Sequence, residues 1–429
     1  MDGIRGNGDM THKPPQTGRR RTGRARCDPD GESVWVYLPS GFMENFNSKH
    51  QHLSPNLWRG VVQFMDEMYR QKYILKKESI RLKKKILQEN IINWSRGVKN
   101  WSTSSGMFVR KGGYKPGEHS YTYDFSKQAA KLNWQCQKIS DKILYRSMKR
   151  RQDKMTAKLT VIELWLKNNI DRIGIDWQTF REDMDRTRRD YLQSIKTGGL
   201  NRKAKRKRWK QFVLAEWTFK QLKAGQYWFY HDEFAGRVHS PITSLPTIAR
   251  KYLRGPSGNP LVELDVGCSQ PLFVAVAAKE AGFHCPEYQA ECEAGTLYDT
   301  ILAESGDPDI KTRKDAKRAM FRYLYRAGRY GSTSIDAFIQ KKYPTFNTFV
   351  KLEKSAKSGN ITLAKKMQRL ESDLVIQNLC QRILKFDPSA FVVTIHDSLL
   401  VEKVPSDLFQ GWFTEAFDSL GVSVHINKR

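Results

Sequence analysis

The sharpest hydrophobic pattern of the chain lies near residue 396, where the apolar runs FVVTI and LLV flank His396 and Asp397. Two apolar runs of strand length around a two-residue break predict a β-hairpin, with strands at residues 391–395 and 399–402. A carboxylate held by two strands is well placed for a metal ligand. Asp is also a common turn former, so this stretch alone leaves an ordinary turn as an alternative.

A second isolated acid, Asp265, ends the apolar run at residues 261–264 and precedes an apolar segment that predicts a helix from near Ser269. Such a strand end lifts a carboxylate out of the core. Asp265 and Asp397 would together suit two Mg²⁺ ions, because Mg²⁺ takes few carboxylates and lets substrate phosphates complete its shell. The apolar segment PLFVAVAA is too short to cross a membrane.

The segment 311–332 shows helical spacing of a different kind. Cations and then aromatic residues recur every four positions on one predicted face, at Arg313, Lys317, Phe321 and Tyr325. Two cations one turn apart can bind a triphosphate, and two rings can stack on a base and its sugar. A purely structural basic helix would instead bury both cations beside the rings, which is costly without partners.

The first half of the chain is predicted to be mostly helical and basic. We expect a disordered basic arm at residues 1–31, an N-terminal helical and β-wing region at 32–139 that binds nucleic acid or serves packing alone, and a helical region at 140–224. Within 32–139, the spacing from residue 57 to about 93 predicts amphipathic helix, and residues 107–125 predict a β-turn element. The run NRKAKRKRWKQF interleaves cations with Trp209 and Phe212, so we expect phosphate contacts from Lys205, Arg206 and Arg208.

Composition supports a polyanionic partner. The chain has 74 Lys and Arg against 45 Asp and Glu, a formal net charge of +29, which favours nucleic acid over other partners. Six cysteines without paired spacing and the lack of a secretory leader predict a cytoplasmic, non-secreted protein without a membrane span. The group His284, Cys285 and Cys292 lacks zinc-site spacing, so we interpret these thiols as structural.

Three segments, ELDVGCSQPLF, RKDAKRAMFRYLY and TIHDSLLVEKVPSD, resemble motifs A, B and C of the family A DNA polymerases, in that family's order. The single-subunit phage-type RNA polymerases share these motifs. Two further segments, AGRVHSPITSLPTIAR and SDLVIQNLCQRI, resemble a primer-side segment and a palm helix of the family. The resemblance covers roughly residues 225–429, and several motifs in order are far more specific than any one alone.

The resemblance implies an α+β right-hand polymerase fold, with palm and fingers at 225–429, a thumb at 140–224 and a basic, mostly helical N-terminal region. It implies two Mg²⁺ ions, with Mn²⁺ as an alternative, and catalytic roles for Asp265, Asp397 and Lys317. The implied metal ligands are Asp265, Asp397 and the main-chain carbonyl of Val266. The implied nucleotide contacts are Arg313, Lys317, Phe321, Tyr325 and Gln270. The implied primer-template contacts are Arg237, His396 and Gln377.

Departures from the family pattern bear on the choice between DNA and RNA. The DNA enzymes usually place Glu five residues after the motif A Asp, where it blocks a ribose 2′-OH, and this chain has Gln270. The bulk of Gln270 is similar to that of the Glu in the DNA enzymes, but Gln270 lacks the negative charge of that Glu. Ser398 after Asp397 and the pair Cys268–Ser269 are closer to the RNA enzymes, whereas the short spacing from Asp265 to Lys317 leaves no room for the insertions of those enzymes.

We therefore expect a monomeric DNA polymerase that acts on a DNA primer-template with dNTPs and without proofreading, in a phage, virus or plasmid. Accessory proteins are not specified by the sequence. The first alternative is a single-subunit RNA polymerase or primase that uses rNTPs. The second is an inactive nucleic-acid-binding replication factor that retains the fold.

Overall fold

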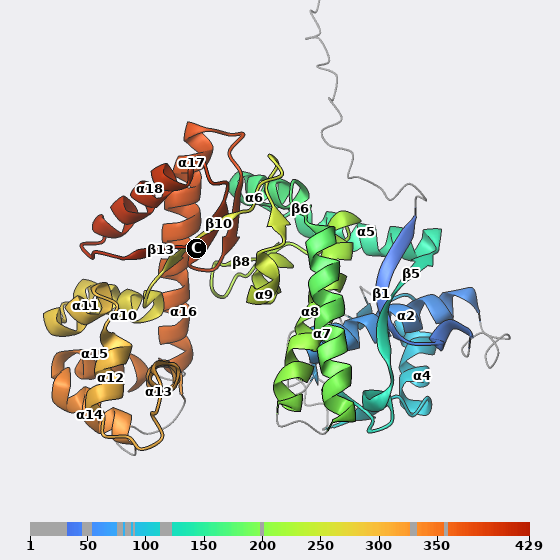
Figure 1. Ribbon diagram of the computed structural model, residues 1–429, viewed down its shortest axis with the longest axis horizontal. Coiled ribbons are helices and arrows are strands. Elements are labelled where there is room, and N and C mark those ends of the chain that lie inside the picture. The colour runs from blue at the N-terminus through green and yellow to red at the C-terminus, as the bar shows by residue number, and fades with distance from the viewer. Residues whose placement is uncertain are drawn as a thin grey trace, which may run out of the picture.

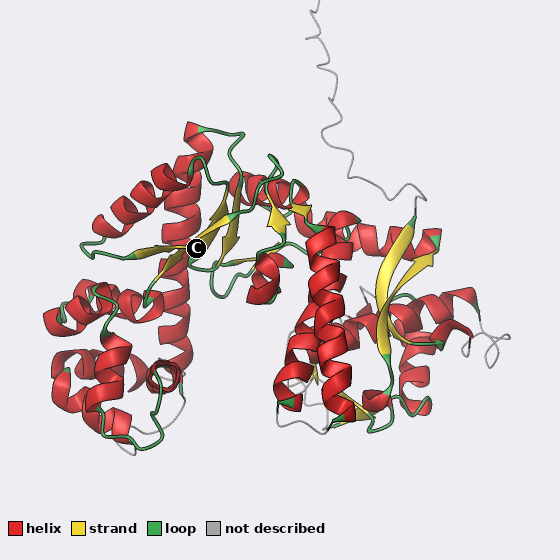
Figure 2. Cartoon of the chain, viewed as in Figure 1, coloured by secondary structure: helices red, strands yellow, loops and turns green. Residues whose placement is uncertain are grey.

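The computed structural model describes residues 32–44, 54–74, 80–81, 87–88, 91–111, 122–197, 201–326, 333–355 and 359–429, so the expected basic arm at 1–31 lies outside the described residues. Two lobes make up the described chain (Figure 1). Helices prevail in both lobes and the strands are short (Figure 2), so the predicted α+β class is confirmed.

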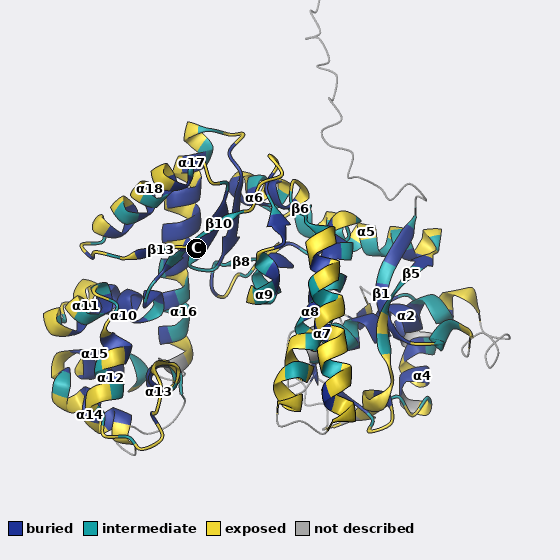
Figure 3. Cartoon of the chain, in the orientation of Figure 1, coloured by how far each residue is buried: buried dark blue, intermediate teal, exposed yellow. Residues whose placement is uncertain are grey.

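A four-stranded antiparallel sheet forms the centre of the C-terminal lobe. Its spatial order is β11 (Val392–Ile395), β12 (Ser398–Val401), β10 (Val262–Val266) and β13 (Ile426–Lys428). The first two strands form the hairpin that the apolar runs predict, with His396 and Asp397 at its turn. Strands β11 and β12 are buried along their length (Figure 3), since helices cover the sheet.

Helices enclose this sheet and extend beyond it. Helix α10 (Ser269–Glu280) directly follows β10, and α18 (Ser406–Asp418) follows the hairpin. A continuous rod of α16 (Gly359–Ser372), the π-helix η5 (Asp373–Cys380) and α17 (Gln381–Phe386) runs past the sheet into a helical subdomain (Figure 1). That subdomain holds α11 (Pro286–Glu293), α12 (Leu297–Glu304), α13 (Arg313–Tyr325), α14 (Ser334–Lys342) and α15 (Pro344–Ser355).

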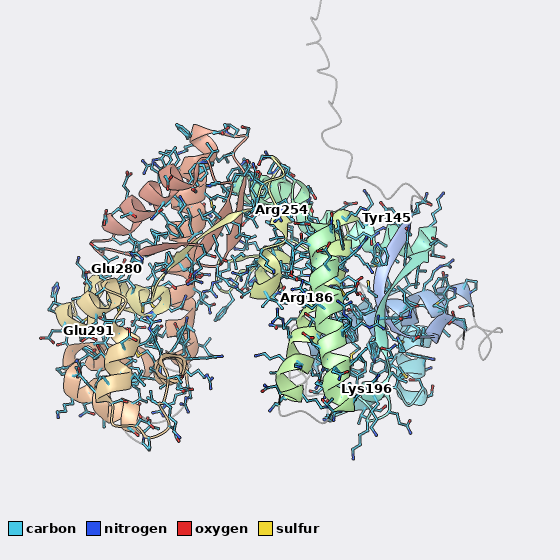
Figure 4. The ribbon with its side chains drawn as sticks, viewed as in Figure 1. Tyr145, Arg186, Lys196, Arg254, Glu280 and Glu291 are labelled. Atoms are coloured by element: carbon cyan, nitrogen blue, oxygen red, sulfur yellow. The ribbon has the colours of Figure 1, made fainter. Side chains whose placement is uncertain are left out.

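The middle of the chain is helical, as predicted, with short strands at the joins. It comprises α5 (Lys142–Thr156), α6 (Val161–Asp171), β6 (Gly174–Ile175), α7 (Trp177–Lys196) and α8 (Arg202–Lys223). The segment that follows contains β7 (Tyr230–His231), β8 (Val238–His239), the 3₁₀ turn η4 (Ile242–Ser244), α9 (Thr247–Arg250) and β9 (Leu253–Arg254). Strands β6 and β9 pair at Arg254, which Figure 4 labels. Arg254 bonds Asp176 at 2.5 Å.

The N-terminal region is less helical than expected. Strand β1 (Ser33–Pro39) pairs with β5 (Trp134–Ser140), next to α2 (Pro55–Tyr69), the π-helix η1 (Arg70–Ile74), η2 (Trp94–Val98), α4 (Lys99–Ser104) and the 3₁₀ turn η3 (Ala129–Lys131). A second sheet has the order β2 (Ile80–Arg81), β4 (Thr122–Phe125), β3 (Phe108–Arg110). The expected helix from 57 to about 93 is wrong at residues 80–81, because Ile80 is buried as a strand residue opposite Tyr123, while residues 75–79, 82–86 and 89–90 lie outside the described residues. The predicted β element at 107–125 is confirmed in β3 and β4.

The buried side chains form two large cores. One gathers residues from Val34 to Leu144, and the other gathers residues from Ile162 to Ile426. Helices α7 and α8 contribute Phe180 and Phe212 to the second core, so they pack as part of the C-terminal unit. The segment boundaries expected at residues 139 and 224 stay predictions. No helix in the described part of the chain combines the length and the apolar character that a membrane span requires.

Candidate active site

The two aspartates singled out by the sequence lie on neighbouring strands. Asp265 of β10 is the cross-strand partner of Ser398 in β12, and Asp397 is the residue immediately before Ser398. The turn of the β11–β12 hairpin therefore delivers one carboxylate beside the other. On its opposite side Asp265 pairs with Asn427 of β13, so the sheet holds this position from both edges.

The surroundings of Asp265 disfavour the charged form of its carboxylate. Burial, and after it the negative charge of Asp397, raises the pKa of Asp265 above its ordinary value. The Arg429 guanidinium, 3.1 Å from Asp265, and more weakly Lys317 act in the opposite direction. The Ser269 hydroxyl at the start of α10 donates to Asp397. Two half-buried acids side by side form a site that attracts cations.

The backbone beside each carboxylate adopts an unusual conformation. His396, directly before Asp397, and Cys268, three residues after Asp265, both have φ of 55°, in the left-handed region that residues with a Cβ seldom adopt. Such positions persist only where the surrounding structure holds them, and they cluster at functional sites.

Helix α13 presents the predicted face as expected. Thr312 caps its start by accepting from the Asp315 amide, and the residues at positions 316, 319, 320, 323 and 324 are buried. Arg313 and Lys317 are exposed, and Phe321 and Tyr325 are half-buried. The cations therefore do not lie on the buried face, and the expected roles of this helix in nucleotide binding stay a prediction.

The two cations of α13 differ in their surroundings. Lys317 is close enough to Asp265 to influence its pKa, and its ammonium lies 5.7 Å from the Phe321 ring and 5.9 Å from the Tyr298 ring. Arg313 instead bonds Asp299 at 3.1 Å and donates to the Gly295 carbonyl at 2.8 Å. That ion pair is exposed, so breaking it to bind an anion costs little.

A polar network connects α10, α13 and α16 beside the carboxylates. The Tyr325 hydroxyl donates to Gln270 Oε1 at 2.8 Å, and Gln270 Nε2 donates to Glu371. Glu371, 1% exposed, also accepts two bonds from Arg237 at 2.6 and 2.7 Å. Burial raises the pKa of Glu371 to about 7, although Arg237 opposes this shift. Both ends of the Gln270 amide are thereby held in place.

Glu371 is a residue that sequence reasoning missed. It stands in the helical stretch QRLESDL, where nothing in the local pattern distinguishes it from a surface acid. Ser269, Asp299 and Arg429 were missed for the same reason, since each acquires its relevance only from a distant partner. Arg237, expected at the primer, is committed to Glu371 in this structure.

His396 lies with its Nδ1 atom buried and without a hydrogen-bond partner among the described residues. Burial and the neighbouring Arg237 lower the pKa of this imidazole to about 4, so the ring is neutral at physiological pH. It is within 5.9 Å of the His239 ring. His396 therefore places a neutral ring directly before Asp397.

Other predicted residues lie apart from this cluster or in its backbone. Val266 is buried in β10 and pairs with Ile426. Gln377 is exposed on η5, and Lys205, Arg206 and Arg208 lie along α8. Their expected contacts with nucleic acid stay predictions. Phe212, in contrast, is 2% exposed and packs on Phe180, so it belongs to the core rather than to a stacking surface.

The donor set fits Mg²⁺ bound together with a substrate. Across the described ranges, no group of three or more His, Cys, Asp and Glu side chains is arranged to hold a metal ion. Asp265 and Asp397 supply hard oxygen donors, and their mutual repulsion would be relieved by divalent cations. The remaining ligands would be phosphate oxygens and water, which is how Mg²⁺ binds at phosphoryl-transfer sites.

No protein-family model matches this chain, and no curated protein matches its sequence. Among solved structures, the chain is similar to one described as the POL domain of Pol1 from M. smegmatis in complex with DNA primer-template and dNTP. The identity is 10% and the TM-score 0.42, over 67% of this chain and 72% of that chain. Since a likeness this low does not transfer a fold or a function, the site must be interpreted from its own residues.

Proposed function

We propose that this chain is a template-directed DNA polymerase that transfers nucleotides from dNTPs to a primer 3′-OH. One observation carries the proposal: Asp265 and Asp397, from segments far apart in the sequence, lie side by side where β10 meets the β11–β12 turn, near Lys317. The three motif-like segments supply the same residues in the order of family A polymerases. The right-hand arrangement of palm, fingers and thumb is part of this proposal.

The proposed roles follow from the positions of the side chains. Asp265 and Asp397, with the Val266 carbonyl, would hold two divalent ions, which when bound lower the pKa of the attacking hydroxyl and neutralise charge on the departing pyrophosphate. Lys317 and Arg313 would bind the triphosphate, while Phe321 and Tyr325 position the base and sugar. Phosphoryl transfer needs little covalent help, so positioning and charge compensation would carry most of the rate.

The Gln270 network supports a preference for dNTPs. Tyr325 and Glu371 hold the Gln270 amide from both sides, so this side chain is rigid where the family blocks a ribose 2′-OH. Glu371, the acceptor of the Gln270 amide, is itself paired with Arg237. The bulk of Gln270, held in one orientation, therefore suits a gate against rNTPs.

Primer extension tests the proposal. The purified chain should extend a labelled primer on a DNA template with Mg²⁺ and dNTPs, and Asp265→Asn or Asp397→Asn should reduce the rate at least about 100-fold. Asp309→Asn, at an exposed acid of the helical subdomain, is the matched control and should change the rate less than about twofold. Unchanged incorporation in Asp397→Asn would refute the proposed site and favour the inactive nucleic-acid-binding factor.

An RNA polymerase or primase is the second candidate, because Ser269, part of the RNA-like Cys268–Ser269 pair, contacts Asp397 directly. The same assay with rNTPs, with and without a primer, separates the two. Primer-free synthesis from rNTPs that exceeds primed synthesis from dNTPs would establish this candidate in place of the first. The absence of proofreading and an origin in a phage, virus or plasmid remain part of the proposal.

A further inference from the structure

A large groove lies between the lobes and reaches the candidate active site. Its volume is about 2350 Å³, and His396 is among the residues that line it. The walls come from the N-terminal region, helices α7 and α8, the segment that carries β7, β8 and α9, and the hairpin residue His396. The residues that matter here are Lys72, Lys131, Lys203, Arg206, Lys207, Trp228, Tyr230, His239 and His396.

The walls of the groove are strongly cationic. Among the described residues that line it, six are Lys or Arg and the one acid is Glu216, which pairs with Lys220 at 2.8 Å. Lys72 is neutralised by Asp124 at 2.8 Å. Lys203, Arg206 and Lys207, successive cations on the groove side of α8, have no carboxylate partner in the described part of the chain. This wall is therefore complementary to a chain of phosphates.

Four aromatic rings form a row from the groove to the active-site hairpin. The ring centroids of Trp228 and Tyr230 are 5.7 Å apart, those of Tyr230 and His239 5.1 Å apart with nearly parallel planes, and those of His239 and His396 5.9 Å apart. Tyr230 is 39% exposed, so a ligand in the groove can reach its ring. The row ends one residue from Asp397.

We propose that this groove binds an unpaired nucleic-acid strand, with its phosphates on Arg206 and Lys207 and its bases stacked on Tyr230 and His239. A single strand fits better than a duplex, because paired bases expose their faces only at the ends of a helix, whereas unpaired bases stack on aromatic side chains at any position. The binding stands on the groove alone. The additional statement, that this strand leads to the reacting centre at Asp397, rests on the proposed function.

Fluorescence anisotropy with labelled oligonucleotides tests this inference without catalysis. The full chain, in chelator and without nucleotides, is titrated into single-stranded DNA, single-stranded RNA and duplex DNA of equal length. The double variant Tyr230→Ala/His239→Ala should weaken single-strand binding about 10- to 100-fold, the loss expected for one or two stacked bases. Tyr230→Phe keeps the ring and should bind as the unmodified chain does, and Phe386→Ala, at an exposed ring elsewhere, should change binding less than about twofold.

Salt dependence tests the cationic wall. Arg206→Ala/Lys207→Ala should reduce the slope of log affinity against log salt by about 1.4, since each phosphate contact to a single strand contributes about 0.7. Arg188→Ala/Arg189→Ala, an exposed pair on α7 outside the groove lining, should leave the slope unchanged. Circular dichroism and thermal melts establish that each variant is folded.

The outcomes separate the two hypotheses. Ring variants that lose single-strand binding but keep duplex binding support the inference. Equal binding by all variants, or an equal loss for single strand and duplex, overturns it. Asp397→Asn should bind the single strand normally, so a lack of primer extension together with ring-dependent binding would refute the proposed function and leave the groove assignment intact. Equal affinity for single-stranded RNA and single-stranded DNA supports a groove that binds unpaired strands of either kind.

Discussion

The side chains of the candidate site bring two acids of like charge close together. Asp265 and Asp397 repel each other, and Arg429 offsets part of that repulsion. An aspartate with only a turn-forming role would be more stable away from a second acid. The fold instead places it there and holds the preceding residue, His396, in a left-handed conformation. Both features favour function over local stability.

His396 provides a pH-dependent prediction. Its pKa is lowered from 6.5 to about 4, so the unfolded chain binds more protons than the folded chain between these values. The stabilisation is therefore present above pH 6.5 and is lost as the pH falls through 4. His396→Asn, which tolerates the left-handed backbone, should make stability less dependent on pH by on the order of 2 kcal/mol across this window.

Urea unfolding of both proteins above pH 6.5 and near pH 4 measures this difference. His425→Asn, at an exposed histidine, is the control and should keep the pH dependence of the unmodified chain. Parallel curves for the unmodified chain and His396→Asn would show that the ring at 396 does not stay neutral on folding.

Helix α13 shows how one helix serves two purposes. Ala316, Ala319, Met320, Tyr323 and Leu324 fix it to the core, while the face with Arg313 and Lys317 stays accessible. The Tyr323 hydroxyl donates to Asn347 at 2.9 Å, which sets the rotation of the helix. The packing of one face therefore determines where the functional face points.

This division of faces predicts a contrast between adjacent residues. Lys317→Ala should lower kcat/KM for dNTP about 10- to 100-fold, because it removes the charge-assisted contact that we propose with the triphosphate. Arg318→Ala, one position along and exposed, removes the same charge from the other face and should lower it less than about twofold. Steady-state primer extension at varied dNTP compares them, and equal losses would show that only net charge matters.

The complete chain joins its two cores through a small aromatic contact. Tyr37 of β1 lies edge-on to Trp217 of α8, with 5.7 Å between ring centroids, and stacks on Tyr69. The Tyr37 hydroxyl donates to the Val213 carbonyl at 3.2 Å. These contacts hold the N-terminal core, residues 34–144, against α8, a helix that lines the groove.

Breaking this contact should uncouple the two cores. Trp217→Ala leaves a cavity at a site 1% exposed and should destabilise the chain by about 3–5 kcal/mol, with calorimetric unfolding resolved into two transitions. Trp217→Phe retains an aromatic ring and removes an indole N–H that lacks a partner among the described residues, so it should cost far less. A single, unshifted transition in Trp217→Ala would show that the stability of the two cores does not depend on this contact.

Local patterns were sufficient for several elements. The apolar runs around Asp397 predicted the hairpin, the run before Asp265 predicted a strand followed by a helix, and the four-residue spacing from Arg313 predicted the accessible face of α13. These features depend on the period of side chains along one segment, which sequence displays directly. The predicted helix up to about residue 93 was wrong at residues 80–81, because pairing with a distant strand overrode local preference there.

Long-range packing alone established the rest. The adjacency of Asp265 to Asp397 follows from strand register between segments distant in sequence, and Glu371 joins the network only because α16 passes beside α10 and α13. The same holds for α8, where the fold buries Phe212 and directs Arg206 and Lys207 into the groove. The sequence by itself determined which residue types are present and at which spacing, and so which chemistry was available. The tertiary structure decided which of these side chains meet, because contacts between distant segments cannot be deduced from local spacing.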